Sequence, residues 1–121
     1  MLYNRILPIA LFLLQAAPAF AGTFCLAGVA MPPQCLYEDV HSCIRAVNAN
    51  DLTCVVNPDA SLSYIGGNRY CQVDANRVAQ CLYVDRNECN NANHGGDKLC
   101  FDRAIMTDTS NPFRLDPRLQ N

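Results

Sequence analysis

The sequence predicts a small, disulfide-rich α+β protein built from two tandem β-β-α-β units. Two observations support this fold class. The chain has 121 residues and eight cysteines. Residues 24–58 align with residues 70–104 at a constant offset of 46, without gaps and with 10 identities in 35 positions. An even number of cysteines at a repeated spacing indicates a disulfide framework, and the short apolar runs around them are typical of strands.

Residues 1–21 have the features of a secretory signal peptide. Arg5 is followed by an apolar run, and Ala19-Phe20-Ala21 has the small-x-small form of a signal-peptidase site. The run is shorter than the ~20 apolar residues that a transmembrane helix needs. We therefore expect cleavage after Ala21, no membrane insertion of the mature chain, and a periplasmic or secreted protein.

The composition agrees with export. Disulfides persist in oxidising compartments, where small domains use them to supplement a limited core. The whole chain has a net charge of −2, and removal of Arg5 makes the mature chain about one unit more negative. This mildly acidic balance, without a basic cluster, argues against nucleic acid as a partner.

The first unit, residues 22–58, is expected to contain two strands, a helix and a third strand. A loop at Met31-Pro32-Pro33 separates the first two strands. Asp39 is the expected N-cap of a helix over residues 40–49, because its carboxylate can accept from the free amides of the first turn. The expected strands cover residues 23–27, 34–37 and 52–56.

The second unit, residues 70–104, repeats this order. Asp85 is the expected N-cap, and Glu88 three residues later completes a capping-box pattern. The asparagines that follow are weak helix formers, so this helix is expected to be short. Residues 59–69 connect the units, and their apolar side chains are expected to pack on one or both of them. Residues 105–121 are expected to form an extended, partly disordered polar tail.

Four cysteines per unit allow three pairings, and the sequence leaves the choice open. We expect the first to pair with the fourth and the second with the third, within units rather than across them. A short loop then separates the inner pair, while the outer pair ties the ends of the unit. The expected bridges are Cys25–Cys54, Cys35–Cys43, Cys71–Cys100 and Cys81–Cys89.

Strand alternation predicts a second apolar face on each sheet, pointing away from the helix. A lone unit would expose these faces. We therefore expect the units to bury them against each other as a pseudo-symmetric pair, or against a partner or a second copy. The residues assigned to them are Phe24, Leu26, Leu36 and Val55 in the first unit, and Tyr70, Gln72, Leu82 and Phe101 in the second.

No pattern in the sequence predicts a catalytic, cofactor or metal site. The cysteines are too far apart for the usual zinc spacing, and Cys-x-x-Cys is absent. His41 and His94 are the only histidines, occupy non-equivalent positions, and are expected to be exposed at helix ends. Residues 85–89 loosely follow a calcium loop but lack its turn glycine. We expect a protein that is not an enzyme and that has no cofactor.

The first unit resembles a family of short, exported four-cysteine domains of unknown function found in rhizobia and other proteobacteria. The matching segments are Phe24-Cys25, Cys35-Leu36-Tyr37, Cys43 and Cys54-Val55-Val56-Asn57-Pro58. The second unit keeps the cysteines and Tyr83 but ends differently. The resemblance implies an exported disulfide-rich domain and no particular activity.

The function expected from the sequence is binding. The leading interpretation is an exported, non-enzymatic interaction module of the cell envelope. The alternatives are a secreted effector or enzyme inhibitor, and a structural subunit of an extracellular assembly.

Overall fold

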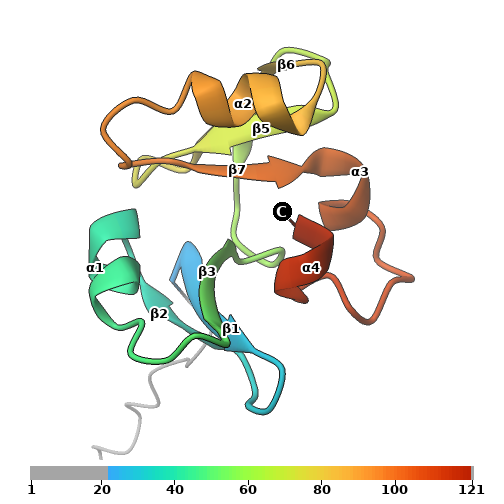
Figure 1. Cartoon of the computed structure of the whole chain (residues 1–121). Helices are drawn as coiled ribbons and strands as arrows, with labels where there is room; N and C mark the ends of the chain where they lie inside the picture. Colours follow the sequence, from blue (N-terminus) through green and yellow to red (C-terminus); the bar gives the residue numbers. More distant parts are fainter. Residues whose placement is uncertain (1–21, 121) are drawn as a thin grey trace, which may run out of the picture.

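A computed structural model describes residues 22–120. The predicted signal peptide, residues 1–21, lies outside the described residues, as does Asn121. The structure has two small sheets, with strand orders β2-β1-β3 and β4-β6-β5-β7, and short helices around them (Figure 1). Together with four disulfides, this confirms the predicted small, disulfide-rich α+β class. Within residues 22–120, no helix has the length and apolar character needed to cross a membrane.

The first unit contains an antiparallel sheet and one short helix, α1 (Val40–Arg45). Asp39 caps the helix as predicted, because its carboxylate accepts the backbone N–H of Ser42 at 2.7 Å and the hydroxyl at 3.0 Å. The helix was expected to reach residue 49 but ends at Arg45, and the residues that follow include asparagine and valine, which propagate a helix poorly. The strands are β1 (Phe24–Gly28), β2 (Gln34–Tyr37) and β3 (Leu52–Val56).

The second unit has the same elements in the same order, with α2 (Arg86–Asn91) as its helix. The carboxylate of Asp85 accepts the N–H of Glu88 at 2.7 Å, which confirms the predicted cap. Glu88 in turn accepts the N–H of Val84 at 3.3 Å. That the units arose by duplication, and where each begins and ends, stay predictions. The strands are β5 (Tyr70–Val73), β6 (Val78–Tyr83) and β7 (Leu99–Asp102).

The connector adds a strand to the second sheet. β4 (Ser63–Ile65) pairs in parallel with the start of β6, and Gly66 follows with a φ of 84°, which suits glycine. Leu62 packs against the core, as expected for an apolar connector residue. In the first sheet, Pro32 and Pro33 stand at the positions of Val78 and Ala79. Because proline has no amide donor, β2 starts later than β6.

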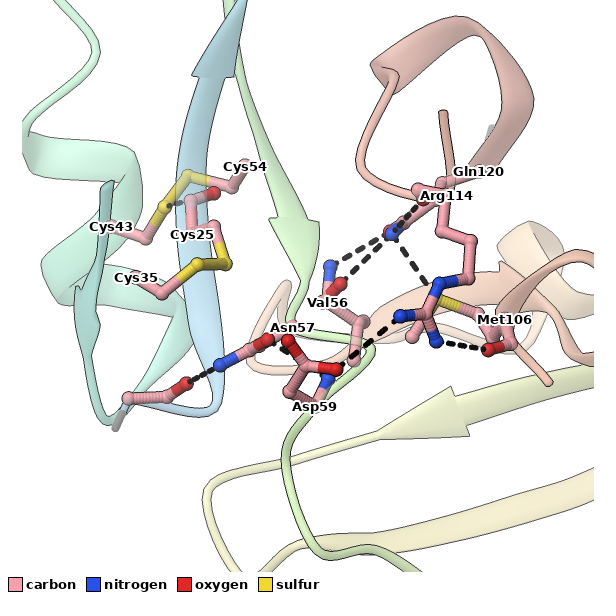
Figure 2. Close-up of a disulfide and its surroundings, with 11 residues drawn as sticks. Cys25, Cys35, Cys43, Cys54, Val56, Asn57, Asp59, Met106, Arg114 and Gln120 are labelled. Carbon is pink, nitrogen blue, oxygen red and sulfur yellow. Dashed lines mark hydrogen bonds and ion pairs between the residues drawn. A yellow bond between two sulfur atoms is a disulfide. The ribbon is translucent and has the colours of Figure 1, made fainter. Parts of the chain in front are cut away.

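The predicted disulfide pairing is wrong. The first cysteine pairs with the second and the third with the fourth, so one bridge staples a β-hairpin and the other ties the helix to the third strand (Figure 2). The reason is the register of the first sheet, in which Leu26 lies opposite Cys54 and Cys25 lies opposite Val55. Opposite residues of an antiparallel pair share a face, so Cys25 and Cys54 point to different sides. The bridges are Cys25–Cys35, Cys43–Cys54, Cys71–Cys81 and Cys89–Cys100.

The predicted strand faces are wrong in part, although Val55 and Phe101 face away from their helices as predicted. In the first unit, Phe24 and Leu26 point toward α1 and not away from it, while Cys25, Ala27, Cys35 and Val55 form the opposite face. The expected interface leucines, Leu36 and Leu82, are both exposed.

One core joins the two units, but they contribute unlike faces to it. The first unit contributes the face that carries α1. The second unit contributes the face opposite α2, so that α2 lies on the far side of its sheet (Figure 1). The packing is therefore head-to-tail, and the expected pseudo-symmetric pair is not observed. The core residues are Phe24, Leu26, Val40, Cys43, Cys54 and Val56 from the first unit, Cys71, Val73, Ala79, Cys81 and Phe101 from the second, and Met106.

The polar tail was expected to be extended and partly disordered, and this prediction is wrong for the part that the structure describes. It contains the end of α3 (Arg103–Met106), which begins in the second unit beside β7, and α4 (Pro117–Gln120), which contacts both sheets (Figure 1). Leu115 packs on the first unit's outer face, against the Cys25–Cys35 hairpin. Tail residues therefore cover a surface that the first unit alone would expose.

Candidate functional site

The residue types that usually carry chemistry are engaged in structure or scattered. All eight cysteines are in disulfides. His41 and His94 are exposed and lie in different units, in agreement with their predicted positions at helix ends. Within residues 22–120, no group of three histidine, cysteine or acidic side chains is placed to hold a metal ion.

The tail is anchored to the first unit by a buried glutamine (Figure 2). Gln120 accepts the N–H of Val56 at 2.8 Å and donates to the carbonyl of the same residue at 2.8 Å. Its side-chain amide thus imitates a neighbouring strand on the free edge of β3. Arg114 adds a hydrogen bond to the Met106 carbonyl and an ion pair with Asp59 at 3.4 Å.

A cleft of about 300 Å³ lies between this tail and the β1–β2 loop. Its walls are mostly apolar, and they include the Asp116–Arg118 ion pair, in which the nitrogen and oxygen atoms are 2.8 Å apart. Because Arg118 donates hydrogen bonds to the carboxylate of Asp116, the pKa of that carboxyl lies below its usual value. The apolar lining side chains are those of Ala27, Val29, Pro33, Pro112, Phe113, Leu115 and Pro117.

A second, shallower hollow lies where β7 passes into α3. Arg69 and Arg103 both border it, together with Gly67, Asn68 and Thr107. These arginines are cross-strand neighbours, because the N–H of Arg103 donates to the carbonyl of Arg69 at 2.8 Å. The hollow therefore brings together two cations from segments that are 34 positions apart.

Both guanidinium groups of the hollow are held in place. Arg69 binds the buried carboxylate of Asp102 through two hydrogen bonds, at 2.9 and 2.6 Å. This pairing raises the pKa of Arg69 above its usual value. Arg103 lies over the ring of Tyr64, 4.7 Å from its centroid, and donates to the carbonyl of Gly66 at 3.2 Å.

The sequence prediction did not single out these arginines, although the alignment of the units held a signal. Arg69 aligns with Thr23, and Arg103 aligns with Asn57. The first-unit residues are buried and serve the fold, since Thr23 accepts from Arg77 and Asn57 donates to the Gly22 carbonyl. Arginine in the second unit at two positions that are uncharged in the first unit indicates a local difference in role.

Exposed apolar side chains gather near the β4–β6 edge of the second sheet. Ile65 is 52% exposed, Leu82 50% and Val84 64%. The Leu82 side chain lies against Gly66, which directly follows Ile65, so Leu82 reaches the end of β4. Leu36, at the position in the first unit that corresponds to Leu82, is 58% exposed.

Comparison with known proteins adds no assignment: no protein-family model matches the chain, and neither the curated proteins nor the solved structures contain a match. The four disulfides nevertheless define a class. This is a small domain of the kind that folds and persists in an oxidising, extracellular-type compartment.

Proposed function

We propose that the chain is an exported, non-enzymatic interaction module of the cell envelope. The four disulfides support the compartment, because such bonds form and persist in oxidising surroundings. The features of residues 1–21 support export by a signal peptide. The resemblance to exported four-cysteine domains from proteobacteria is part of the same proposal.

The observation that carries the binding role is the exposed apolar edge of the second sheet, formed by Ile65, Leu82 and Val84. The core side chains of the same sheet are almost completely buried, so the chain has enough structure to hide apolar groups and leaves these outside. Burial of apolar area drives most protein association, and a cluster on an ordered sheet edge loses little conformational entropy on binding. A protein partner with an apolar patch fits this edge.

The test is a comparison of captured partners. The oxidised protein and its Leu82→Asp variant are used as bait in periplasmic extract and in culture medium. We expect a partner that wild type retains and Leu82→Asp loses, because a carboxylate at the centre of the patch must be desolvated on binding. Ile44→Asp, a change at a similarly exposed residue of α1, is the matched control and should still capture the partner. Equal capture by all three proteins would contradict the assignment of this edge.

A structural subunit is the second candidate, because Leu36 and Leu82 are exposed at corresponding positions and could bring copies of the chain together. Light scattering of the wild type over a range of concentrations distinguishes the two roles. A monomer at all concentrations rules out self-assembly, whereas oligomers that Leu36→Asp and Leu82→Asp dissolve favour it.

A further inference from the structure

We propose that the hollow between Arg69 and Arg103 binds an oxyanion, namely a phosphate, sulfate or carboxylate group of a ligand. This site is separate from the apolar edge described above, and it stands whether or not that edge binds a protein. The proposal rests on the placement of the two charges, on their fixed orientation, and on the contrast with the first unit.

The two arginines oppose each other across a strand pair. Tyr70 lies opposite Asp102 in the register of β5 and β7, and the backbone hydrogen bond from Arg103 to Arg69 extends that pairing by one residue. Like charges at directly opposite positions destabilise an antiparallel pair. Asp102 offsets part of this repulsion through its ion pair with Arg69, and an anion bound between the two side chains would offset the rest.

Within residues 22–120, an ion pair compensates the charge of Arg69 but not that of Arg103. The carboxylate of Asp102 is fully buried and pairs with Arg69. Arg103 contacts a carbonyl oxygen and the face of an aromatic ring, and both of these orient a guanidinium without neutralising it. The hollow therefore keeps a net positive charge although the protein as a whole is acidic.

The orientation of the guanidinium groups favours an oxyanion over other ligands. A planar guanidinium carries several N–H groups that suit the oxygens of a carboxylate or phosphate, and Asp102 accepts from the Nε and Nη2 groups of Arg69. Because Tyr64 and Asp102 already restrict the two side chains, binding costs less conformational entropy than at free arginines. Gly67, on the same rim, has open space where a side chain would begin, so the backbone does not obstruct entry.

The first unit provides an internal comparison. Its backbone makes the same hydrogen bond, from Asn57 N–H to the Thr23 carbonyl at 2.8 Å, but both side chains are uncharged and buried. The backbone hydrogen bond is therefore common to both units, and of these two positions only those in the second unit carry charged side chains. This backbone hydrogen bond forms without arginine side chains, so the fold does not require them at these positions.

The test is a titration of the oxidised protein with inorganic phosphate, with sulfate and with acetate, at constant ionic strength kept by sodium chloride. NMR signals of the arginine Nε–H groups and of the Gly67 and Asn68 amides report binding. We expect saturable shifts confined to these signals, and at least tenfold weaker binding in Arg103→Gln. The control variant Arg118→Gln, at an exposed tail arginine, should bind as wild type does. Tighter binding of phosphate and sulfate than of acetate indicates a phosphorylated or sulfated ligand, and the reverse indicates a carboxylate.

A second variant tests the site even if Arg103→Gln does not fold. Asn68→Asp places a carboxylate on the rim at an exposed position, and it should abolish the shifts while the rest of the spectrum stays unchanged. The proposal is overturned if no ion gives saturable shifts at these signals. It is also overturned if Arg103→Gln and Asn68→Asp, both folded, bind as tightly as wild type.

Discussion

The two units have the same elements in the same order and the same disulfide pattern, yet they turn opposite faces to the shared core. The residues that differ explain this. Leu26, Val40 and Val56 make the helix-side face of the first unit apolar. The corresponding residues of the second unit are Gln72, Arg86 and Asp102.

Head-to-tail packing has a consequence that symmetric packing lacks. A heterologous contact leaves one unused face at each end, and a further unit could add there. In the second unit, the face that is not used in the shared core is polar and lies on the helix side. There Gln72 donates to the Cys89 carbonyl and Asp102 binds Arg69. At the other end, the tail covers the outer face of the first unit, where Leu115 packs. Stacked repeats use the same logic when their terminal units have a polar outer face.

The largest expected effect comes from exchanging residues between corresponding faces. Val40→Arg gives α1 the residue that α2 has and should cost about 3–5 kcal/mol, because it places an unpaired charge in the core. The reverse change, Arg86→Val, should alter stability by less than about 0.5 kcal/mol, since Arg86 is exposed. Urea unfolding of the oxidised proteins measures both. Similar costs for the two changes would show that the units pack symmetrically after all.

Removal of one helix disulfide from each unit gives the next largest effect. The pairs Cys43–Cys54 and Cys89–Cys100 each span 11 residues, so either double alanine variant should lose about 3 kcal/mol from loop entropy. The first should lose more, because both of its cysteines are part of the shared core and their removal also leaves a cavity. Midpoints of urea unfolding compare the two variants. A larger loss for the second pair would argue against a core built on the α1 side.

Local sequence signals predicted the elements well and their faces poorly. The caps at Asp39 and Asp85 were predictable because a cap depends on residues within one turn. The disulfide pairing was not, because it depends on how β1 aligns with its neighbours. Between Phe24 and Leu26 the register of β1 against β2 shifts by one residue, and such a shift changes which side chains share a face.

The role of the tail was also beyond local signals. The sequence predicted an extended, partly disordered tail, because the docking of this segment depends on a surface that exists only after the first sheet forms. Gln120 illustrates this, because a single polar residue near the chain end gives no periodic pattern, yet its amide pairs with the edge of β3. The arginine hollow depends in the same way on the pairing of β5 with β7.

The contact of Gln120 with Val56 predicts an intermediate loss of stability. Gln120→Ala leaves the N–H and the carbonyl of Val56 without their partner at a buried position, which should cost about 2 kcal/mol. Gln34→Ala, at an exposed glutamine of β2, is the matched control and should be close to neutral. Urea unfolding measures the loss, and hydrogen exchange at the Val56 amide locates it. Unchanged protection of that amide in Gln120→Ala would show that the tail does not hold the first unit.

The smallest expected effect concerns the caps of the two helices. The pKa of Asp39 lies below its usual value because the carboxylate accepts two hydrogen bonds from Ser42. Its charge therefore stabilises the fold above pH 3.8, the value for the unperturbed group, and this contribution is lost as the pH falls through the lower pKa of the folded state. Asp39→Asn keeps an oxygen that can accept from the backbone but removes the charge.

We therefore expect the urea midpoint of wild type to exceed that of Asp39→Asn slightly at pH 6, with the difference disappearing well below pH 3.8. Ser42→Ala removes the hydroxyl donor and keeps the backbone N–H, so it should reduce the difference at pH 6 without abolishing it. A difference that is independent of pH would mean that the shape of the side chain, and not its charge, caps α1.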